Sequence, residues 1–162
     1  IRIEEKEKLM KLDHIDKKIL MELQLDGRAT ASHIGERVDL SVPAAAERIK
    51  KLQESGVIKG FRAVIDANTL GLDVSAIITV VSDSSKYYEK VIFEANKMPE
   101  VVRCFTTTGE GSHILLVQTK NTKSLETLLR KIQSWPGVIR TNTQLILSSY
   151  KDLSPIYFEN EN

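Results

Sequence analysis

The sequence predicts an α+β fold, with an N-terminal winged helix-turn-helix followed by a C-terminal ferredoxin-like βαββαβ domain. Three short segments before residue 56 carry apolar residues at helical spacing. From residue 74 onward, β-branched runs and amphipathic segments follow in the order strand, helix, strand, strand, helix, strand. We expect five parts: an arm over 1–11, the winged unit over 12–66, a linker over 67–73, the ferredoxin-like domain over 74–152 and a tail over 153–162.

The composition is that of an ordinary globular protein. The 162 residues are 41% hydrophobic and 28% charged, with a net charge of +1. Because this net charge is small, any nucleic-acid binding has to come from the local placement of charge. No apolar run is long enough to span a membrane, and no signal segment opens the sequence. Cys104 is the sole cysteine, which favours a reducing, cytoplasmic setting.

The first two helices are marked by their N-caps. Asp13, with Asp16 three residues later, begins a helix that runs to about Leu25. Thr30 caps a second, shorter helix over 31–38. A short link then leads to a third helix, and this spacing is typical of a helix-turn-helix.

The third helix has a start signal, a periodic body and a stop signal. Ser41 caps it, and Pro43 falls in the first turn, where a missing N–H costs nothing. Gly56 suits the left-handed residue that ends a helix. One face is apolar, formed by Ala45, Ile49 and Leu52.

A wing is predicted directly after this helix. Residues 57–65 have an apolar pattern that suggests a strand or a strand pair, with Lys59 and Arg62 on the exposed side. Residues 66–71 predict a turn and the linker.

The second domain is predicted from its alternating elements. We expect strands over 74–81, 101–108, 114–119 and 138–149, and helices over 85–98 and 122–135. Each helix is followed by a bulky residue, a proline, a spacer and a valine that begins a strand, in Met98-Pro99-Glu100-Val101 and Trp135-Pro136-Gly137-Val138. The repeated exit fits the two halves of a ferredoxin-like fold.

One face of the predicted sheet lacks a cover. The first strand is apolar on both faces and is expected to be buried on both, and neither face of the last strand is plainly polar. Since the two helices cover one face only, we expect the other to pack against a second copy, most simply as a twofold dimer. The alternative is that residues 153–158 fold back over it.

The residues offer little for catalysis. His14, His33 and His113 are dispersed, without metal-ligand spacing to one another, to cysteine or to carboxylates. There is no glycine-rich phosphate loop, and Cys104 lies in a strand pattern as a small core residue. We therefore predict no enzyme, no metal site and no cofactor.

The third helix is the candidate DNA-reading element. Its amide-rich start and Ser41 are placed for phosphate, and its first residues are small enough to approach base edges. The predicted contact set is Thr30, Ser41, Val42, Ala44, Ala45, Arg48 and Lys51. Two alternatives remain: Lys51 pairs with Glu47 on a solvated face, and Arg48 packs at the helix edge on Leu52.

A composite motif spans most of the chain. Its parts are Leu12-Asp13-x-x-Asp16-x-x-Ile19-Leu20, Asp26-Gly27-Arg28, Leu40-Ser41, Glu47-Arg48-Ile49-x-x-Leu52-x-x-Ser55-Gly56-Val57-Ile58 and Gly60-Phe61. With these motifs the chain resembles the leucine-responsive regulatory protein / asparagine-operon regulator (Lrp/AsnC, or feast-famine) family, from about Leu12 to Tyr150.

The resemblance implies a transcriptional regulator that dimerises through the open sheet face and assembles further, often to octamers. It also implies a small effector, usually an amino acid, bound between dimers at a loop that here comprises Thr108, Gly109, Glu110, Gly111, Ser112 and His113. Many relatives carry an Asp followed by an aromatic residue where this chain has Ser112-His113. A hairpin turn made by Gly109 and Gly111, with no ligand, is the alternative.

The expected function is sequence-specific binding of double-stranded DNA by a dimer-based regulator, modulated by an amino acid. The expected location is the cytoplasm, at the nucleoid of a bacterium or archaeon, with no membrane partner. The alternative is an amino-acid-binding oligomeric module whose helical domain mediates protein contacts.

Overall fold

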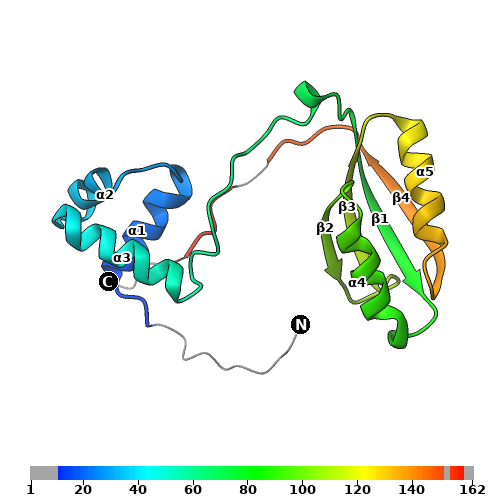
Figure 1. Cartoon of the computed structure of the whole chain (residues 1–162), viewed down its shortest axis with the longest axis horizontal. Coiled ribbons are helices and arrows are strands. Elements are labelled where there is room, and N and C mark those ends of the chain that lie inside the picture. The colour runs from blue at the N-terminus through cyan, green and yellow to red at the C-terminus, as the bar shows by residue number, and fades with distance from the viewer. Residues whose placement is uncertain (1–10, 152–153, 159–162) are drawn as a thin grey trace. The chain divides into compact units, whose positions relative to one another are not determined.

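The computed structural model describes residues 11–151 and 154–158, and the chain divides into two compact units (Figure 1). The helical unit comprises Ile1–Val64 with Lys151–Asn162, and the sheet unit comprises Ile65–Tyr150. Of the predicted arm over 1–11, only Lys11 lies within the described residues. Among the described residues, no helix has the length and apolar character needed to cross a lipid bilayer.

The helical unit contains the three predicted helices, α1 (His14–Leu25), α2 (Ala31–Val38) and α3 (Val42–Glu54). Asp13, Thr30 and Ser41 are their N-caps, as predicted. The three helices pack around one core, because each turns its apolar stripe inward. The fully or nearly fully buried members of that core are Ile19, Leu23, Ile34, Val38, Ala45 and Leu52.

The predicted strand or strand pair over residues 57–65 is wrong, because this segment forms no strand. A strand needs a neighbour that takes up its backbone N–H and C=O groups, and the described part of the helical unit holds only helices and extended chain. Most of the segment's side chains are exposed, including Phe61 and Val64.

The sheet unit has the predicted βαββαβ order. Its strands are β1 (Val74–Ser82), β2 (Val101–Thr106), β3 (His113–Thr119) and β4 (Val138–Ile146). They form one antiparallel sheet in the order β2-β3-β1-β4. The first predicted helix is a single 3-10 turn, η2 (Ser85–Tyr87), followed by α4 (Tyr88–Lys97); the second is α5 (Thr122–Gln133). A further 3-10 turn, η1 (Asn68–Leu70), precedes the sheet.

Helices α4 and α5 cover one face of the sheet. Side chains alternate along β1: Ala76, Ile78 and Val80 are completely buried on the helix side, and their neighbours face the other way. Ile77 and Thr79 on that other face are only partly buried. The expectation that the first strand is buried on both faces is therefore wrong for this single chain. We call the uncovered side the open face.

The described tail residues contact α1 rather than the sheet. The Gln24 side-chain amide donates to the Ile156 carbonyl (3.2 Å), and the Ile156 N–H donates to Gln24 Oε1 (2.6 Å). This two-way pairing fixes residue 156 in the helical unit, to which the tail also belongs by its contacts. The alternative in which residues 153–158 cover the open face is thus not the arrangement that the described tail residues adopt.

Candidate DNA-binding surface and effector loop

Arg48 joins α3 to the start of α1. Its Nη1 lies 2.7 Å from Asp13 Oδ2 and 2.7 Å from Asp16 Oδ1. Asp13 and Asp16 also form the capping box of α1, in which each carboxylate accepts from the other residue's N–H. The guanidinium therefore bridges two helices, and it is not the free cation that a contact with DNA would require.

The charges of this cluster reinforce one another. The hydrogen bond from the Asp16 N–H is the main cause that lowers the pKa of Asp13; burial opposes it, and the Arg48 guanidinium lowers the pKa further. Hydrogen bonds to the two carboxylates raise the pKa of Arg48. Both shifts favour the ionised forms of Asp13 and Arg48, and the role of the cluster is to fix the position of α3 on α1.

The turn from α2 into α3 is tight. Asp39 adopts the left-handed conformation (φ 56°), and the Leu40 N–H donates to the Gly35 carbonyl (2.9 Å). A Cβ at position 35 would lie 2.6 Å from the Leu40 carbonyl oxygen, so this position needs glycine. The close approach sets where α3 begins relative to α2.

The N-terminal end of α3 presents small residues to solvent. Ser41 Oγ accepts from the Ala44 N–H (3.4 Å), and the first turn contains no acidic residue. Val42 is 49% exposed, Ala46 is exposed and Ala44 is partly buried. Ala45 is completely buried, so its predicted base contact is wrong: its methyl group packs in the core of the helical unit.

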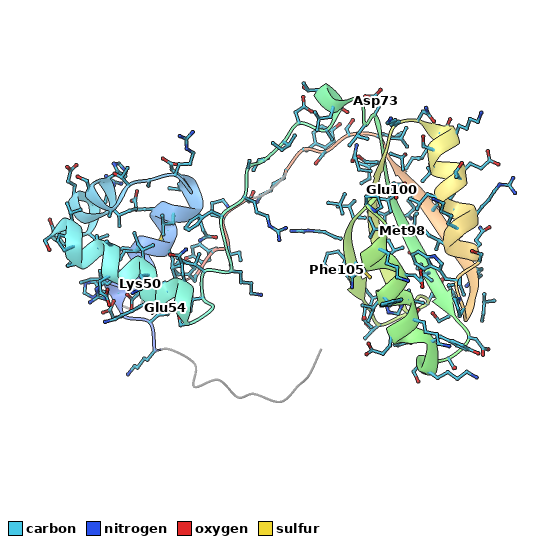
Figure 2. All side chains as sticks on the ribbon, in the orientation of Figure 1. Lys50, Glu54, Asp73, Met98, Glu100 and Phe105 are labelled. Carbon is cyan, nitrogen blue, oxygen red and sulfur yellow. The ribbon has the colours of Figure 1, made fainter. Side chains whose placement is uncertain are left out.

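The remaining predicted DNA-contacting residues lie at the surface. Thr30 is exposed and caps α2 by accepting from the His33 N–H (3.2 Å). Lys51 Nζ lies 3.7 Å from Glu47 Oε1, which is the pairing foreseen as the alternative to a DNA contact. Lys50 and Glu54, one turn apart on α3 (Figure 2), form a second pair at 3.7 Å. Exposed pairs of this kind add little stability, so both lysines stay available to an anion.

A polar hollow of about 240 Å³ adjoins the predicted effector loop on the open face. Thr108, Glu110 and Gly111 of the loop line it. Thr107, just after the end of β2, lines it as well, and the strands contribute the rest of the lining, which is Thr79, Val81, Ile114, Arg140 and Asn142. Glu110 and Arg140 supply one charge of each sign, which complements the ammonium and carboxylate groups of an amino acid.

The strand residues that line this hollow were not predicted as effector contacts from the sequence. Strand pairing alone brings Val81 opposite Arg140 and Thr79 opposite Asn142. The alternation of polar and apolar residues along the last strand was the one available signal, and it does not specify a partner strand.

Ser112 and His113 are buried, and neither lines the hollow. Ser112 Oγ donates to the Val80 carbonyl (3.2 Å) and lies 2.8 Å from Ser82 Oγ and 2.9 Å from His113 Nδ1. The Tyr88 ring meets the imidazole edge-on at 4.9 Å, and burial lowers the pKa of His113. Their predicted contact with an effector is therefore wrong, because the core and its hydrogen bonds occupy both side chains.

The backbone of the loop requires glycine at positions 109 and 111 whether or not a ligand binds. Gly109 has a φ of 102°, which L side chains rarely adopt, and a Cβ on Gly111 would clash with Thr79 Cγ2. The hairpin alternative thus accounts for both glycines. The case for a ligand depends instead on the opposite charges of Glu110 and Arg140.

Comparison with known proteins identifies both domains. Residues 12–59 match the winged helix-turn-helix DNA-binding model, and residues 74–156 match the Lrp/AsnC ligand binding domain. The HTH-type transcriptional regulator FL11 of Pyrococcus horikoshii is 41% identical over 145 residues, covering 90% of this chain and 95% of FL11.

Solved structures agree with this match. The feast or famine regulatory protein of M. tuberculosis complexed with L-methionine is 33% identical, with a TM-score of 0.82, covering 87% of this chain and 95% of that one. A transcriptional regulator of Neisseria meningitidis in complex with L-Met is 28% identical, with a TM-score of 0.84, covering 90% and 96%.

A helix-turn-helix domain followed by a ligand-binding domain of this type defines a transcriptional regulator and not an enzyme. The chain belongs to the Lrp/AsnC family.

Proposed function

We propose that this regulator binds double-stranded DNA sequence-specifically by placing the N-terminal half of α3 in the major groove. The observation that carries the proposal is the exposed start of that helix, which offers small side chains and no acidic residue in its first turn. An α-helix fits the major groove, and the free N–H groups at its start favour a nearby phosphate.

The surface residues divide into two roles. Val42 and Ala44 approach base edges, where short apolar side chains can contact thymine methyl groups. Ser41, Thr30 and Lys51 contact phosphates, which position the helix without reading sequence. Arg48 has no role in DNA contact in this proposal, because its charge is held by α1.

We propose that the working form is at least a homodimer, assembled through the open face and able to form larger assemblies such as octamers. Apolar side chains lie on this face of the two central strands and of β2, and the exposed fraction of Phe105 is 47%. The apolar members are Ile77, Val81, Phe105, Ile114 and Leu116. A second copy would remove them from water, and a twofold dimer would present two α3 helices to successive half-sites.

An amino acid is the proposed effector, bound in the polar hollow by Arg140 and Glu110. Related proteins in complex with L-methionine support this choice of ligand. The hollow opens on the same face as the proposed dimer contact. An effector there changes assembly or DNA binding only if its affinity differs between the alternative states. The bacterial and archaeal sources of the relatives support action in the cytoplasm, at the nucleoid.

Replacing Val42 with aspartate tests the DNA-binding role. Val42 is the first residue of α3, where an acidic side chain favours the helix, so the fold is retained while a negative charge is placed toward DNA. We expect the affinity for duplex DNA, measured by fluorescence anisotropy, to fall by about 1–3 kcal/mol, roughly 5- to 150-fold.

Thr122→Asp is the matched control. Thr122 is the exposed first residue of α5, so the variant makes the same charge change at the same helical position of the sheet unit. We expect its DNA affinity to equal that of the wild type. Equal affinity of Val42→Asp and Thr122→Asp would contradict the proposal and favour the alternative in which the helical domain contacts protein.

A further inference from the structure

A second hollow, of about 300 Å³, lies in the helical unit beside α3. We call it the cationic hollow, because its polar lining consists of Arg28, Lys50 and Gln53 and includes no carboxylate. Its floor is apolar, with Ile49 and Phe61 among the lining residues. A concave surface with two cations and no acid suits an anionic partner that has an apolar framework.

Arg28 lies on the loop between α1 and α2, and it differs from the two arginines on the described helices of this unit. Arg37 is paired with Glu22 (3.1 Å), and Arg48 with two aspartates. The structure gives the Arg28 guanidinium no hydrogen bond or ion pair with any described residue. Its backbone N–H donates to Asp26 Oδ1 (2.8 Å), so the loop holds the residue while the charge stays free.

The position of the cationic hollow along α3 indicates the partner. Val42, Ala46 and Lys50 are exposed at positions i, i+4 and i+8 and so form one stripe on the helix. Eight residues span about 12 Å of helix axis, which is close to the width of the major groove. With Val42 at the base edges, Lys50 and the hollow beside it therefore fall near the wall of the groove, where the phosphates run.

We infer that the sugar–phosphate backbone of DNA lies across the cationic hollow, with Arg28 and Lys50 each contacting a phosphate. The phosphates supply the negative charge that the lining lacks, and the deoxyribose rings match the apolar floor. The inference rests on the proposed binding of α3 to DNA, which it extends to two residues outside the sequence-predicted contact set.

The test is a salt titration of binding to a fluorescent duplex of mixed sequence. Each phosphate contact contributes about 0.9 to the slope of log affinity against log salt concentration. We expect the magnitude of the slope to fall by about 0.9 in Arg28→Gln and by about 1.8 in the Arg28→Gln/Lys50→Gln double variant. Arg28→Lys keeps the charge, so we expect it to retain the wild-type slope.

Arg37→Gln is the matched control, because it removes the same charge from an arginine of the same unit that does not line the cationic hollow. Thermal unfolding of each variant checks that the fold is retained. An unchanged slope in Arg28→Gln, or an equal loss in Arg37→Gln, would overturn the inference while leaving α3 binding intact. If the wild type binds no duplex even at low salt, the proposed function itself fails, and the two failures are therefore distinguishable.

Discussion

Arg48 lies on α3, but its charge is directed at α1. Its side chain is 32% exposed, and its two partners differ: Asp13 is 47% exposed and Asp16 is 5% exposed. A nearly buried carboxylate needs a partner, because an unpaired charge in a low-dielectric surrounding is costly. At this position the motif residues therefore serve the packing of the helical unit, whereas Arg28, on the loop before α2, has no ion-pair partner among the described residues.

Arg48→Ala is expected to destabilise the helical unit, because it leaves Asp16 buried without its cationic partner. The expected loss in the free energy of unfolding is about 2 kcal/mol, less than for a fully buried pair because part of Arg48 faces water. Urea unfolding followed by circular dichroism measures this change at neutral pH.

The control for this measurement is Arg37→Ala, which breaks a pair whose arginine side chain is 59% exposed. We expect it to change the free energy of unfolding by less than about 1 kcal/mol. If Arg48→Ala costs no more than Arg37→Ala, the proposed structural role of Arg48 is incorrect.

At the scale of elements, helices were predictable because their signals are local. The caps Asp13, Thr30 and Ser41 and the apolar stripes lie within a few residues of the helices that they define. The order of the sheet elements was predictable for the same reason. The conformation of residues 57–65 could not be predicted in this way, since an apolar pattern does not indicate whether a partner strand exists.

Candidate site residues could be predicted from the sequence only where they all lie on one helix or loop. Val42 and Thr30 lie at the surface, as a DNA contact requires, but the burial of Ala45 depends on how α3 packs in its unit. The sequence did not predict Arg140 or Arg28 as candidate site residues, because tertiary structure places each beside its hollow. Strand pairing places Arg140, and the packing of a loop beside α3 places Arg28.

The loop over 107–112 and the strand ends beside it form the proposed effector site, and its occupancy can be measured by thermal unfolding. An amino acid that binds the folded state raises the midpoint of thermal unfolding. We expect L-methionine or another member of a panel of the twenty amino acids to do so for the wild type. Arg140→Gln is expected to abolish the shift, because it removes the cation that pairs with the ligand's carboxylate.

Arg130→Gln provides the comparison for Arg140→Gln. Arg130 is an exposed arginine of α5 that pairs with Glu126 (2.7 Å) and lines neither hollow. We expect this variant to keep the shift. An equal shift in Arg140→Gln would remove the polar hollow as the effector site, and the absence of a shift with every amino acid would contradict the effector proposal as a whole.

At the scale of the whole molecule, the proposed function combines a helix that reads DNA with a sheet that brings two copies together. A single α3 reads only a few base pairs, whereas two copies related by a twofold axis read a longer, symmetric site. The uncovered apolar side chains of the open face, Ile77 and Phe105 among them, are what favours a second copy. Sequence specificity and dimerisation are therefore expected to appear together in the DNA sites that the protein selects.

In vitro selection from a pool of random-sequence duplexes, with the full chain as the binding protein, tests whether a dimer reads a symmetric site. We expect enrichment of inverted repeats whose half-site centres are separated by one helical turn, about 10–10.5 base pairs, or a multiple of it. Val42→Asp, run in parallel, is expected to enrich these repeats more weakly than the wild type. A wild-type pool that remains indistinguishable from the starting pool after repeated rounds would contradict the account.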